Sequence, residues 1–311
     1  MSRPQPSYLN LSVAELAERA AQAVARLAHC DLCPRLCGVD RLAGQAGYCR
    51  GGRLARVASW HAHMWEEPPI SGWEGSGTIF FSNCTARCLF CQNYPISQMG
   101  VGEEKSSEAL ARIMLRLQRQ GCHNLNLVTP THYVPQVLEA LVLARAGGLA
   151  IPLLYNTSGY DRPETLRLLE GIVDIYLPDS KYADDVEARR LSDYVGYVAH
   201  NRAALLEMAR QVGVRLACDE EGIAYRGMVI RHLVLPERLS QTAQVLAWIA
   251  AQLGREVYVS LMAQYFPAHL AVDHPQLGRR LSVVEYDRAV QTIEALGLDG
   301  GWRQELGEES G

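Results

Sequence analysis

The sequence contains no uninterrupted apolar run that approaches the roughly eighteen residues of a membrane-spanning helix. Its first residues also lack the apolar core of a secretory signal peptide. We therefore expect no membrane association and a soluble, cytoplasmic protein.

The chain has no basic tract either. Its 30 lysines and arginines are outnumbered by 34 acidic residues, which gives a formal net charge of −4. A protein that binds nucleic acid mainly through phosphates needs a concentrated positive face, so we expect no nucleic-acid partner. With 311 residues and 48% hydrophobic content, the chain can bury a large core as one α/β domain with an appendage.

Cysteine is the residue that the chain has in unusual number and arrangement. In a reducing compartment, nine cysteines indicate metal ligation rather than disulfides. Cys122 and Cys218 stand alone and are interpreted as ordinary buried residues. The other seven form two tight groups: Cys30, Cys33, Cys37 and Cys49, then Cys84, Cys88 and Cys91.

The second group has Cys-x3-Cys-x2-Cys spacing and directly follows an apolar run at residues 78–81. Three thiolates can bind three irons of a [4Fe–4S] cube and leave the fourth iron open to another ligand. Zinc usually takes a fourth protein ligand. His61 and His63, some twenty residues upstream, keep a Cys3His zinc site as the alternative.

The first group places four cysteines within twenty residues, with Gly44 and Gly47 between the last two. This set predicts a second metal site at Cys30, Cys33, Cys37 and Cys49. Both an all-thiolate zinc ion and an auxiliary [4Fe–4S] cluster use such a set. The cluster is favoured because the protein is already expected to carry one, and an oxidised, metal-free site is the third alternative.

The predicted fold is α/β, an open partial (βα)6 barrel of TIM type. Residues 1–77 form a small cysteine-rich N-terminal extension and residues 78–311 the barrel. The extension begins with a capping box at Ser12 and Glu15, a helix to about residue 27 and a strand at 54–60. The barrel alternates strands at 78–83, 123–128, 150–156, 173–178, 227–235 and 257–262 with helices at 107–120, 133–146, 162–170, 197–212, 239–253 and 283–297.

Local sequence signals mark the ends of some of these units. Gly121, Gly147 and Gly171 are predicted to stop the first three helices. Residues 213–226 are predicted to form a small hairpin before the fifth strand.

Polar residues follow the predicted strands at the ends where a parallel barrel places its active site. Because those ends meet on one face, we expect these side chains to surround one cavity with the Cys84, Cys88 and Cys91 triad. The residues, in strand order, are Thr129 and Thr131, then Asn156, Thr157 and Ser158, then Asp179 and Lys181, then Arg231, and finally Gln264.

The triad, with Phe90 just before its last cysteine, resembles the signature of the radical S-adenosylmethionine (SAM) enzymes. The wider sequence at residues 80–93 is similar to that of the pyruvate formate-lyase activating enzymes. This resemblance implies catalytic cysteines at the triad, with SAM on the open iron and reductive cleavage of SAM to a 5′-deoxyadenosyl radical that abstracts hydrogen. It also implies a one-electron donor of the flavodoxin or ferredoxin type.

The resemblance, which covers about residues 78–265, further implies cofactor contacts. Phe90 matches the aromatic position beside adenine, and Asn93 the asparagine after the triad. The segment from Asn156 to Gly159 looks like the family's Asp-Thr-Asn-Gly, Asp179 and Lys181 like its Asp-x-Lys, and Arg231 like its strand-five arginine.

The chain departs from that family at three places. Pro130-Thr131-His132 stands where Gly-Gly-Glu usually binds the SAM ammonium, so the hydroxyl of Thr129 or Thr131 could replace that contact. Gln264 stands where the family has a histidine. The four-cysteine element precedes the triad instead of following it.

Other interpretations concern charged residues. Asp179 and Lys181 could simply pair with each other. Arg231 lies inside an apolar run and needs a buried anion, which favours a ligand role. Glu66 and Glu67, with the nearby histidines, could line the active-site mouth or belong to a rigid connecting loop.

Three functions remain open from the sequence. The substrate of the radical could be a glycine in a partner protein, as for the activating enzymes. It could instead be a small molecule or a peptide. The chain could also be a non-catalytic electron-transfer or zinc-stabilised module, although a simple electron carrier would not need polar residues at every strand end.

Overall fold

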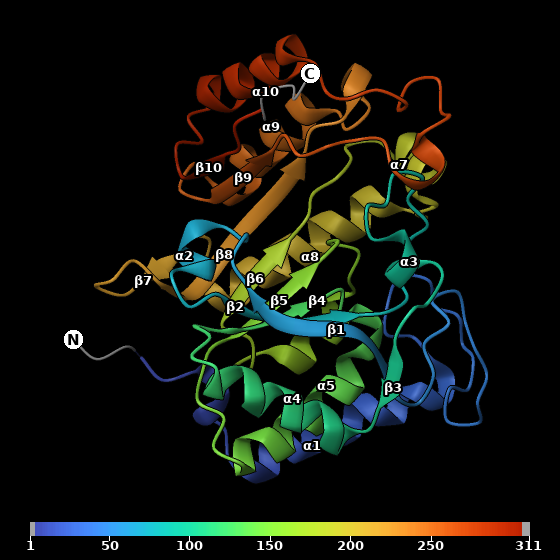
Figure 1. The fold of residues 1–311 in the computed structure, drawn as a ribbon, viewed down its shortest axis with the longest axis vertical. Coiled ribbons are helices and arrows are strands. Elements are labelled where there is room, and N and C mark those ends of the chain that lie inside the picture. The colour runs from blue at the N-terminus through green and yellow to red at the C-terminus, as the bar shows by residue number, and fades with distance from the viewer. Residues whose placement is uncertain (1–3, 307–311) are drawn as a thin grey trace.

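The computed structural model describes residues 4–306, which form one mixed sheet surrounded by helices (Figure 1). The parallel strands are β2 (Ser76–Phe81), β4 (Leu125–Val128), β5 (Leu153–Thr157), β6 (Ile175–Pro178), β8 (Ala224–Leu233), β9 (Tyr258–Met262) and β10 (Gly301–Arg303). Antiparallel to β2 runs β1 (Ala55–His63), which also pairs with β3 (Glu103–Lys105). The order is β10-β9-β8-β6-β5-β4-β2-β1-β3, so the sheet is open and the predicted partial barrel is confirmed.

All six predicted helices of the barrel are present. They are α4 (Ser107–Arg119), α5 (Val134–Ala146), α6 (Pro163–Leu166), α8 (Tyr197–Val212), α9 (Thr242–Leu253) and α10 (Val283–Ala295). The third is shorter than predicted, because one α-helical turn passes into a 3-10 turn at Arg167–Leu169. An additional helix, α7 (Asp185–Ser192), was not predicted; the Asp184 side chain caps its first turn. No helix of the described chain is long and apolar enough to span a membrane.

Glycines end the first three of these helices as predicted. Gly121 and Gly171 follow helical segments and have left-handed φ values of 91° and 70°. At the end of α5 the left-handed residue is Gly148, with φ of 89°, whereas Gly147 remains at −83°. The helix ends at Ala146 with Gly147 as its C-terminal cap residue, so this prediction is confirmed as well.

The two faces of the sheet have different partners. The outward faces of the strands pack under the helices in the main hydrophobic core. The inward faces of β5, β6 and β8 contribute Leu154, Leu177 and Val229 to a smaller cluster. Ile70, from the short helix α2 (Pro68–Ser71), joins this inner cluster and is fully buried. The segment that contains α2 therefore packs inside the curve of the sheet.

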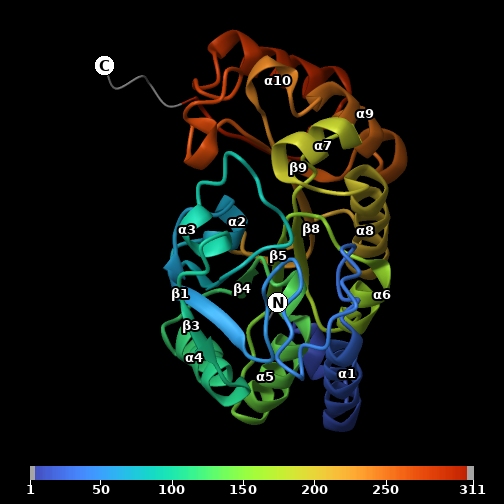
Figure 2. The ribbon, with the colours of Figure 1, turned by 90° about the vertical axis from the view of Figure 1, so that its right-hand side faces the viewer.

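The N-terminal extension packs on the outside of the barrel. Helix α1 (Val13–Ala25) starts with the predicted capping box, because the Ser12 and Glu15 side chains each accept from the other's backbone amide. It runs beside α5, and the loop that follows it passes α6 (Figure 2). There the Thr165 hydroxyl donates to the Leu32 carbonyl at 2.7 Å. The predicted strand of the extension is β1, so the extension shares the barrel's sheet; the boundary at residue 77 remains a prediction.

The predicted hairpin is also present. Strand β7 (Ala217–Cys218) pairs antiparallel with the start of β8. Strand β8 therefore begins three residues before the predicted start at Gly227. Gly227 has φ of 123°, and a Cβ there would lie 2.0 Å from the Arg215 carbonyl oxygen, so only glycine fits at this crossing of the hairpin. Cys218 is exposed on the short strand β7, so its interpretation as a buried residue was wrong, whereas Cys122 is buried as expected.

Candidate functional site

The triad lies in the loop that follows the C-terminal end of β2. Asn83, at the start of this loop, has a left-handed φ of 72°, and its side chain donates to the Tyr133 hydroxyl at 3.1 Å. The chain therefore turns sharply out of the sheet before the cysteines. Cys84, Cys88 and Cys91 are free thiols and half-buried. This placement suits ligands of a metal centre that lies beyond the strand ends.

The number of thiols fits a cluster better than a single ion. A zinc ion usually takes a fourth protein ligand, whereas three cysteines can bind a [4Fe–4S] cube and leave its fourth iron open. The alternative zinc ligands are also used elsewhere, since His61 stacks on Phe80 with ring centroids 5.4 Å apart.

Three charged side chains meet at the ends of β6 and β8. The Arg231 Nε lies 3.1 Å from Asp179 Oδ1, and the Lys181 ammonium contacts the other oxygen of Asp179. Burial disfavours the charged carboxylate, but the two cations outweigh burial and hold the pKa of Asp179 below its ordinary value. The suggested pair of Asp179 and Lys181 is thus real, and it belongs to a larger network.

This network lies next to the triad. Burial raises the pKa of the Cys88 thiol to about 12, and the nearby Lys181 ammonium works against that rise. A lysine from the end of the fourth barrel strand therefore acts electrostatically on a cysteine from the first. Residues far apart in the sequence meet on one face, as the barrel topology predicts.

Arg231 also extends into the barrel interior. Its guanidinium donates to the Asn156 side-chain oxygen and lies 3.3 Å from Glu66 Oε2. The other Glu66 oxygen accepts from Asn126 at 3.2 Å and from Asn156 at 3.4 Å. The buried anions that Arg231 requires are thus side chains of the protein itself, Asp179 and Glu66.

Glu66 and Glu67 are the acids that the sequence offered only as candidates for the site. They directly precede α2, and the burial of Ile70 beneath the sheet's inner face carries them into the barrel. Burial raises the pKa of Glu67, although the neighbouring Arg231 opposes the rise. The signal that could have identified Glu66 is the pair of prolines at 68 and 69, which start a helix immediately after two acids.

The hydroxyls of Thr131 and Thr157 are used inside the chain. Both donate to the fully buried Asp161, at 2.8 Å and 2.6 Å, and the Tyr155 hydroxyl donates to it at 2.9 Å. Burial raises the pKa of Asp161, and the hydroxyl donors oppose that rise. Asp161 was missed because no local pattern marks an acid whose partners come from two different strand ends. The contact of the two threonines with a cofactor remains a prediction.

The end of β9 lies against the triad loop. Phe90 is buried and meets Tyr265 edge-on, with ring centroids 6.0 Å apart. The Gln92 side chain donates to the Gln264 carbonyl at 3.0 Å. Gln264 is itself exposed, with its side chain near Met262. The predicted sixth strand end is therefore part of the same region as the triad.

The remaining predicted contacts lie around this region. Asn93 is exposed and precedes the first turn of α3 (Tyr94–Ser97). Thr129 has a left-handed φ of 58°, and its amide donates to the Asn156 carbonyl at 2.8 Å. The Ser158 carbonyl accepts from the Tyr197 hydroxyl at 3.0 Å. Their backbone positions are thus fixed, and their contact with a cofactor remains a prediction.

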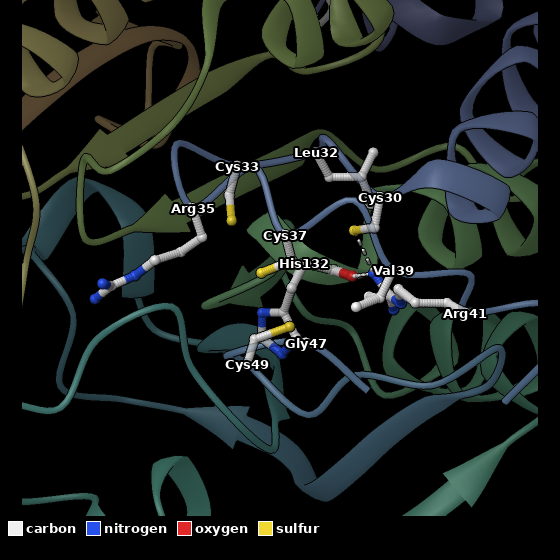
Figure 3. Close-up of a pocket in the computed structure, with 10 residues that line it drawn as sticks. All are labelled: Cys30, Leu32, Cys33, Arg35, Cys37, Val39, Arg41, Gly47, Cys49 and His132. Carbon is white, nitrogen blue, oxygen red and sulfur yellow. Dashed lines mark hydrogen bonds between the residues drawn. The ribbon is translucent and has the colours of Figure 1, made fainter. Parts of the chain in front are cut away.

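The four N-terminal cysteines line one enclosed pocket (Figure 3). The loop that carries them is closed by paired backbone bonds between Cys30 and residues 38–39. Backbone amides donate to two of the sulfurs, from Tyr48 to Cys37 and from Gly51 to Cys49, each at 3.4 Å. Burial raises the pKa of the Cys49 thiol, although Arg41 opposes the rise. The sequence therefore brings all four sulfurs to one site.

Two arginines that lie over the Tyr48 ring connect this pocket with the triad loop. The Arg35 guanidinium lies 3.6 Å from the centre of the Tyr48 ring, and the Arg87 guanidinium 4.5 Å from it. Arg87 also donates to the carbonyls of Tyr48 and Cys84, at 2.6 Å and 2.9 Å. Arg35 donates to the Thr85 carbonyl at 3.0 Å. The four-cysteine element thus supports the backbone of the triad directly.

The family model described as the Radical SAM superfamily matches residues 78–233 of the chain. Among curated proteins, an uncharacterized protein of Methanocaldococcus jannaschii is 29% identical over 308 residues, which cover 95% of this chain and 81% of that protein.

Solved structures with a similar fold include two enzymes. A radical SAM methyltransferase from Sphaerobacter thermophilus has 18% identity and a TM-score of 0.48, over 97% of this chain and 95% of that one. Methylornithine synthase has 16% identity and a TM-score of 0.47, over 73% of this chain and 63% of that one.

Proposed function

Because the chain belongs to the radical SAM superfamily, we propose that Cys84, Cys88 and Cys91 bind three irons of a [4Fe–4S] cluster whose fourth iron is open to SAM. The donor set fits this cofactor, since three free thiols follow the first barrel strand and three thiolates leave one iron of the cube open. When bound, the cluster and SAM supply one-electron cleavage to a 5′-deoxyadenosyl radical, which takes a hydrogen atom from the substrate. The protein is a radical SAM enzyme, and the chemistry beyond that is our proposal.

One observation carries the assignment of the site. Lys181, from the end of β6, pairs with Asp179, and its charge opposes the rise that burial causes in the pKa of Cys88, so the charged network of the strand ends adjoins the triad. We propose that Arg231 binds the SAM carboxylate, because its guanidinium offers a planar set of donors. Glu66 and Asp179 hold that guanidinium in position.

We propose that Glu66 also supplies the acceptor for the SAM ammonium. The segment that the family uses for this contact is engaged elsewhere, because Thr131 bonds to Asp161 and the His132 ring bonds to the Ser82 carbonyl at 3.0 Å. Glu66 is the acid that contacts Asn156 and Arg231 together. A carboxylate there gives the ammonium the partner that Thr131 and His132 do not offer.

The substrate that we propose is a protein glycine, as for the activating enzymes. Exposed apolar side chains rim the triad loop, with Met99 at 68% and Leu270 at 60% exposure. The second of these belongs to a segment that is tied to the loop, since the Ala271 amide donates to the Leu89 carbonyl at 3.0 Å. Exposed apolar surface beside a site supports binding of a protein partner. The alternative is a small molecule or a peptide.

We further propose two accessory components. A one-electron donor of the flavodoxin or ferredoxin type would reduce the triad cluster. The pocket of Cys30, Cys33, Cys37 and Cys49 would hold a second metal centre, for which iron–sulfur and zinc are the alternatives.

The experiment that tests the substrate assignment uses the reduced, cluster-loaded protein with SAM. It is mixed with purified glycyl-radical enzymes one at a time, and electron paramagnetic resonance detects any glycyl radical that forms. The paired variant Met99→Ser, Leu270→Ser should reduce the radical yield while SAM cleavage without substrate is unchanged. If no partner protein gains a radical and a small metabolite instead loses hydrogen to 5′-deoxyadenosine, the alternative is correct.

A further inference from the structure

The four-cysteine pocket contains a buried cation that has no carboxylate partner. Arg41 is only 1% exposed. Within the described part of the chain, its guanidinium donates to the carbonyls of His132 and Gly52, each at 2.8 Å, and to the Cys30 sulfur at 3.9 Å. The guanidinium also lies 5.8 Å from the centre of the Tyr133 ring. A buried charge without an opposite charge is unfavourable, so buried charges are normally paired or coordinate a metal centre. Arg41 therefore indicates an anion in this pocket.

Two polar atoms of the pocket wall have no hydrogen-bond partner in the protein. They are Arg41 Nε and His132 Nδ1, and His132 is also 1% exposed. The other ring nitrogen of His132 donates to the Ser82 carbonyl, and the His132 side chain lies at the pocket wall (Figure 3). Arg41 Nε is a donor, and buried donors nearly always have an acceptor, so this atom points to an anionic ligand in the pocket.

We propose that this pocket binds a [4Fe–4S] cluster through the four thiolates, with Arg41 as its buried counter-cation. The inference deepens the second metal centre proposed above by choosing between its two alternatives. Four thiolates make such a centre net anionic, which provides the missing partner of Arg41. Each thiol gives up its proton when it binds iron.

The surroundings of the four sulfurs suit an iron–sulfur cluster. Hydrogen bonds to the sulfurs come from the amides of Tyr48 and Gly51 and from Arg41. Such bonds are a principal means by which proteins set the potential of a cluster.

Two glycines give the pocket its shape. A Cβ at Gly47 would lie 2.9 Å from the Cys37 sulfur, and a Cβ at Gly51 would lie 2.9 Å from a terminal nitrogen of Arg41. Any side chain at residue 47 would therefore push Cys37 away from the pocket. The backbone of the loop is fitted closely around the sulfurs and their cation.

His132 joins this centre to the catalytic strand. Its Nε2 donates to the carbonyl of Ser82, two residues before Cys84, and its own carbonyl accepts from Arg41. The residue thus contacts the counter-cation of one centre and the strand that leads to the other. We assign His132 as a positioning residue.

Metal analysis of the anaerobically reconstituted protein tests the proposal. The wild type should bind about eight irons and eight sulfides per chain, because each cube holds four. The Cys30→Ala, Cys33→Ala variant should retain about four irons. The triple variant with alanine at Cys84, Cys88 and Cys91 should also retain about four, which separates the second centre from any failure of the triad. About four irons and one zinc in the wild type, with the zinc lost in the first variant, would overturn the cluster assignment. Equal metal in the wild type and the first variant would overturn the site.

The charge role of Arg41 is tested by a matched pair of variants. Arg41→Gln should release iron from the second centre faster under a chelator, and should lower its reduction potential in a redox titration followed by electron paramagnetic resonance. Arg41→Lys keeps the charge and should restore the potential in part. Because either change could affect folding, the rise in melting temperature on metal loading is compared, and it should be smaller for Arg41→Gln than for wild type. An unchanged release rate, potential and melting-temperature rise in Arg41→Gln would contradict the proposal.

Discussion

Arg231 of β8 pairs with Asp179 at the end of β6, with the guanidinium Nε 3.1 Å from the carboxylate Oδ1. The same guanidinium reaches Glu66, which enters the barrel from the segment before α2. One side chain therefore connects a strand end that the barrel rule predicts with an acid that it does not. The site is built around this arginine, and the first prediction concerns it.

Replacement of Arg231 should weaken SAM binding and destabilise the protein. In Arg231→Gln, Asp179 and Glu66 lose their buried cation, and removal of one partner of a buried pair costs about 3–5 kcal/mol. Equilibrium dialysis with SAM and chemical denaturation measure the two effects. The control is Arg189→Gln, whose side chain is 59% exposed and should change neither quantity. Wild-type SAM affinity in Arg231→Gln would mean that the arginine is purely structural.

Loss of charge should have different effects on SAM binding at the two neighbouring glutamates. Glu66→Gln should weaken SAM binding by about tenfold to a hundredfold, because a charged acceptor is replaced by a neutral one. Glu67→Gln should leave SAM affinity unchanged and the free energy of unfolding equal or higher, since burial already disfavours the charged form of Glu67. Isothermal titration and urea denaturation of both variants check this contrast. An equal loss of SAM affinity in both variants would contradict the role given to Glu66.

Asp161→Asn should destabilise the barrel. Three buried hydroxyls, from Thr131, Thr157 and Tyr155, donate to this carboxylate. An amide can accept at only one atom, so at least one hydroxyl would lose its partner, at a cost of about 1–3 kcal/mol. Urea denaturation of the metal-free protein measures it, with the exposed Asp299→Asn as the control. Equal unfolding free energies in the two variants would argue against the network.

Stability should fall in mild acid because of His232. This buried imidazole contacts the Ser180 carbonyl at 2.6 Å and the Thr242 hydroxyl at 2.9 Å, and burial lowers its pKa to about 4. The unfolded value is about 6.5, so the unfolded state binds more protons between these pH values. The contribution is therefore complete above about pH 6.5 and lost as the pH falls towards 4, by at most about 3 kcal/mol.

Unfolding free energies of the wild type and His232→Gln, measured from pH 4 to pH 7, test this linkage. The variant should show a flatter pH dependence across that range, whatever its stability at pH 7. His132 titrates in both proteins, so the difference between their slopes isolates His232. Parallel curves would show that His232 does not carry the effect.

Much of the fold could be predicted because its signals are local. Each of the six βα units joins an apolar run to an amphipathic segment, and Gly121 and Gly171 occupy the left-handed positions that end helical segments. The edge strand β10 and the helix α7 were missed. Strand β10 has three residues, and its pairing with β9 provides the stability that its own sequence lacks.

The site could be predicted only where residues follow strand ends. Asn156, Asp179, Lys181 and Arg231 meet as the topology requires. Glu66 and Asp161 could not be found in this way, because their partners come from distant segments that only the folded chain brings together. The cysteine spacings identified both clusters of thiols, yet spacing alone could not reveal that Arg41 is buried beside one of them.

The central claim is that the triad supports reductive cleavage of SAM. The most direct measurement is chromatographic detection of 5′-deoxyadenosine after the anaerobically reconstituted protein is incubated with dithionite and SAM. We predict that the wild type forms it only when reductant is present, that Cys88→Ala forms none, and that the lone Cys218→Ala matches wild type. Absence of 5′-deoxyadenosine from the fully loaded wild type, or an equal yield from Cys88→Ala, would contradict the account.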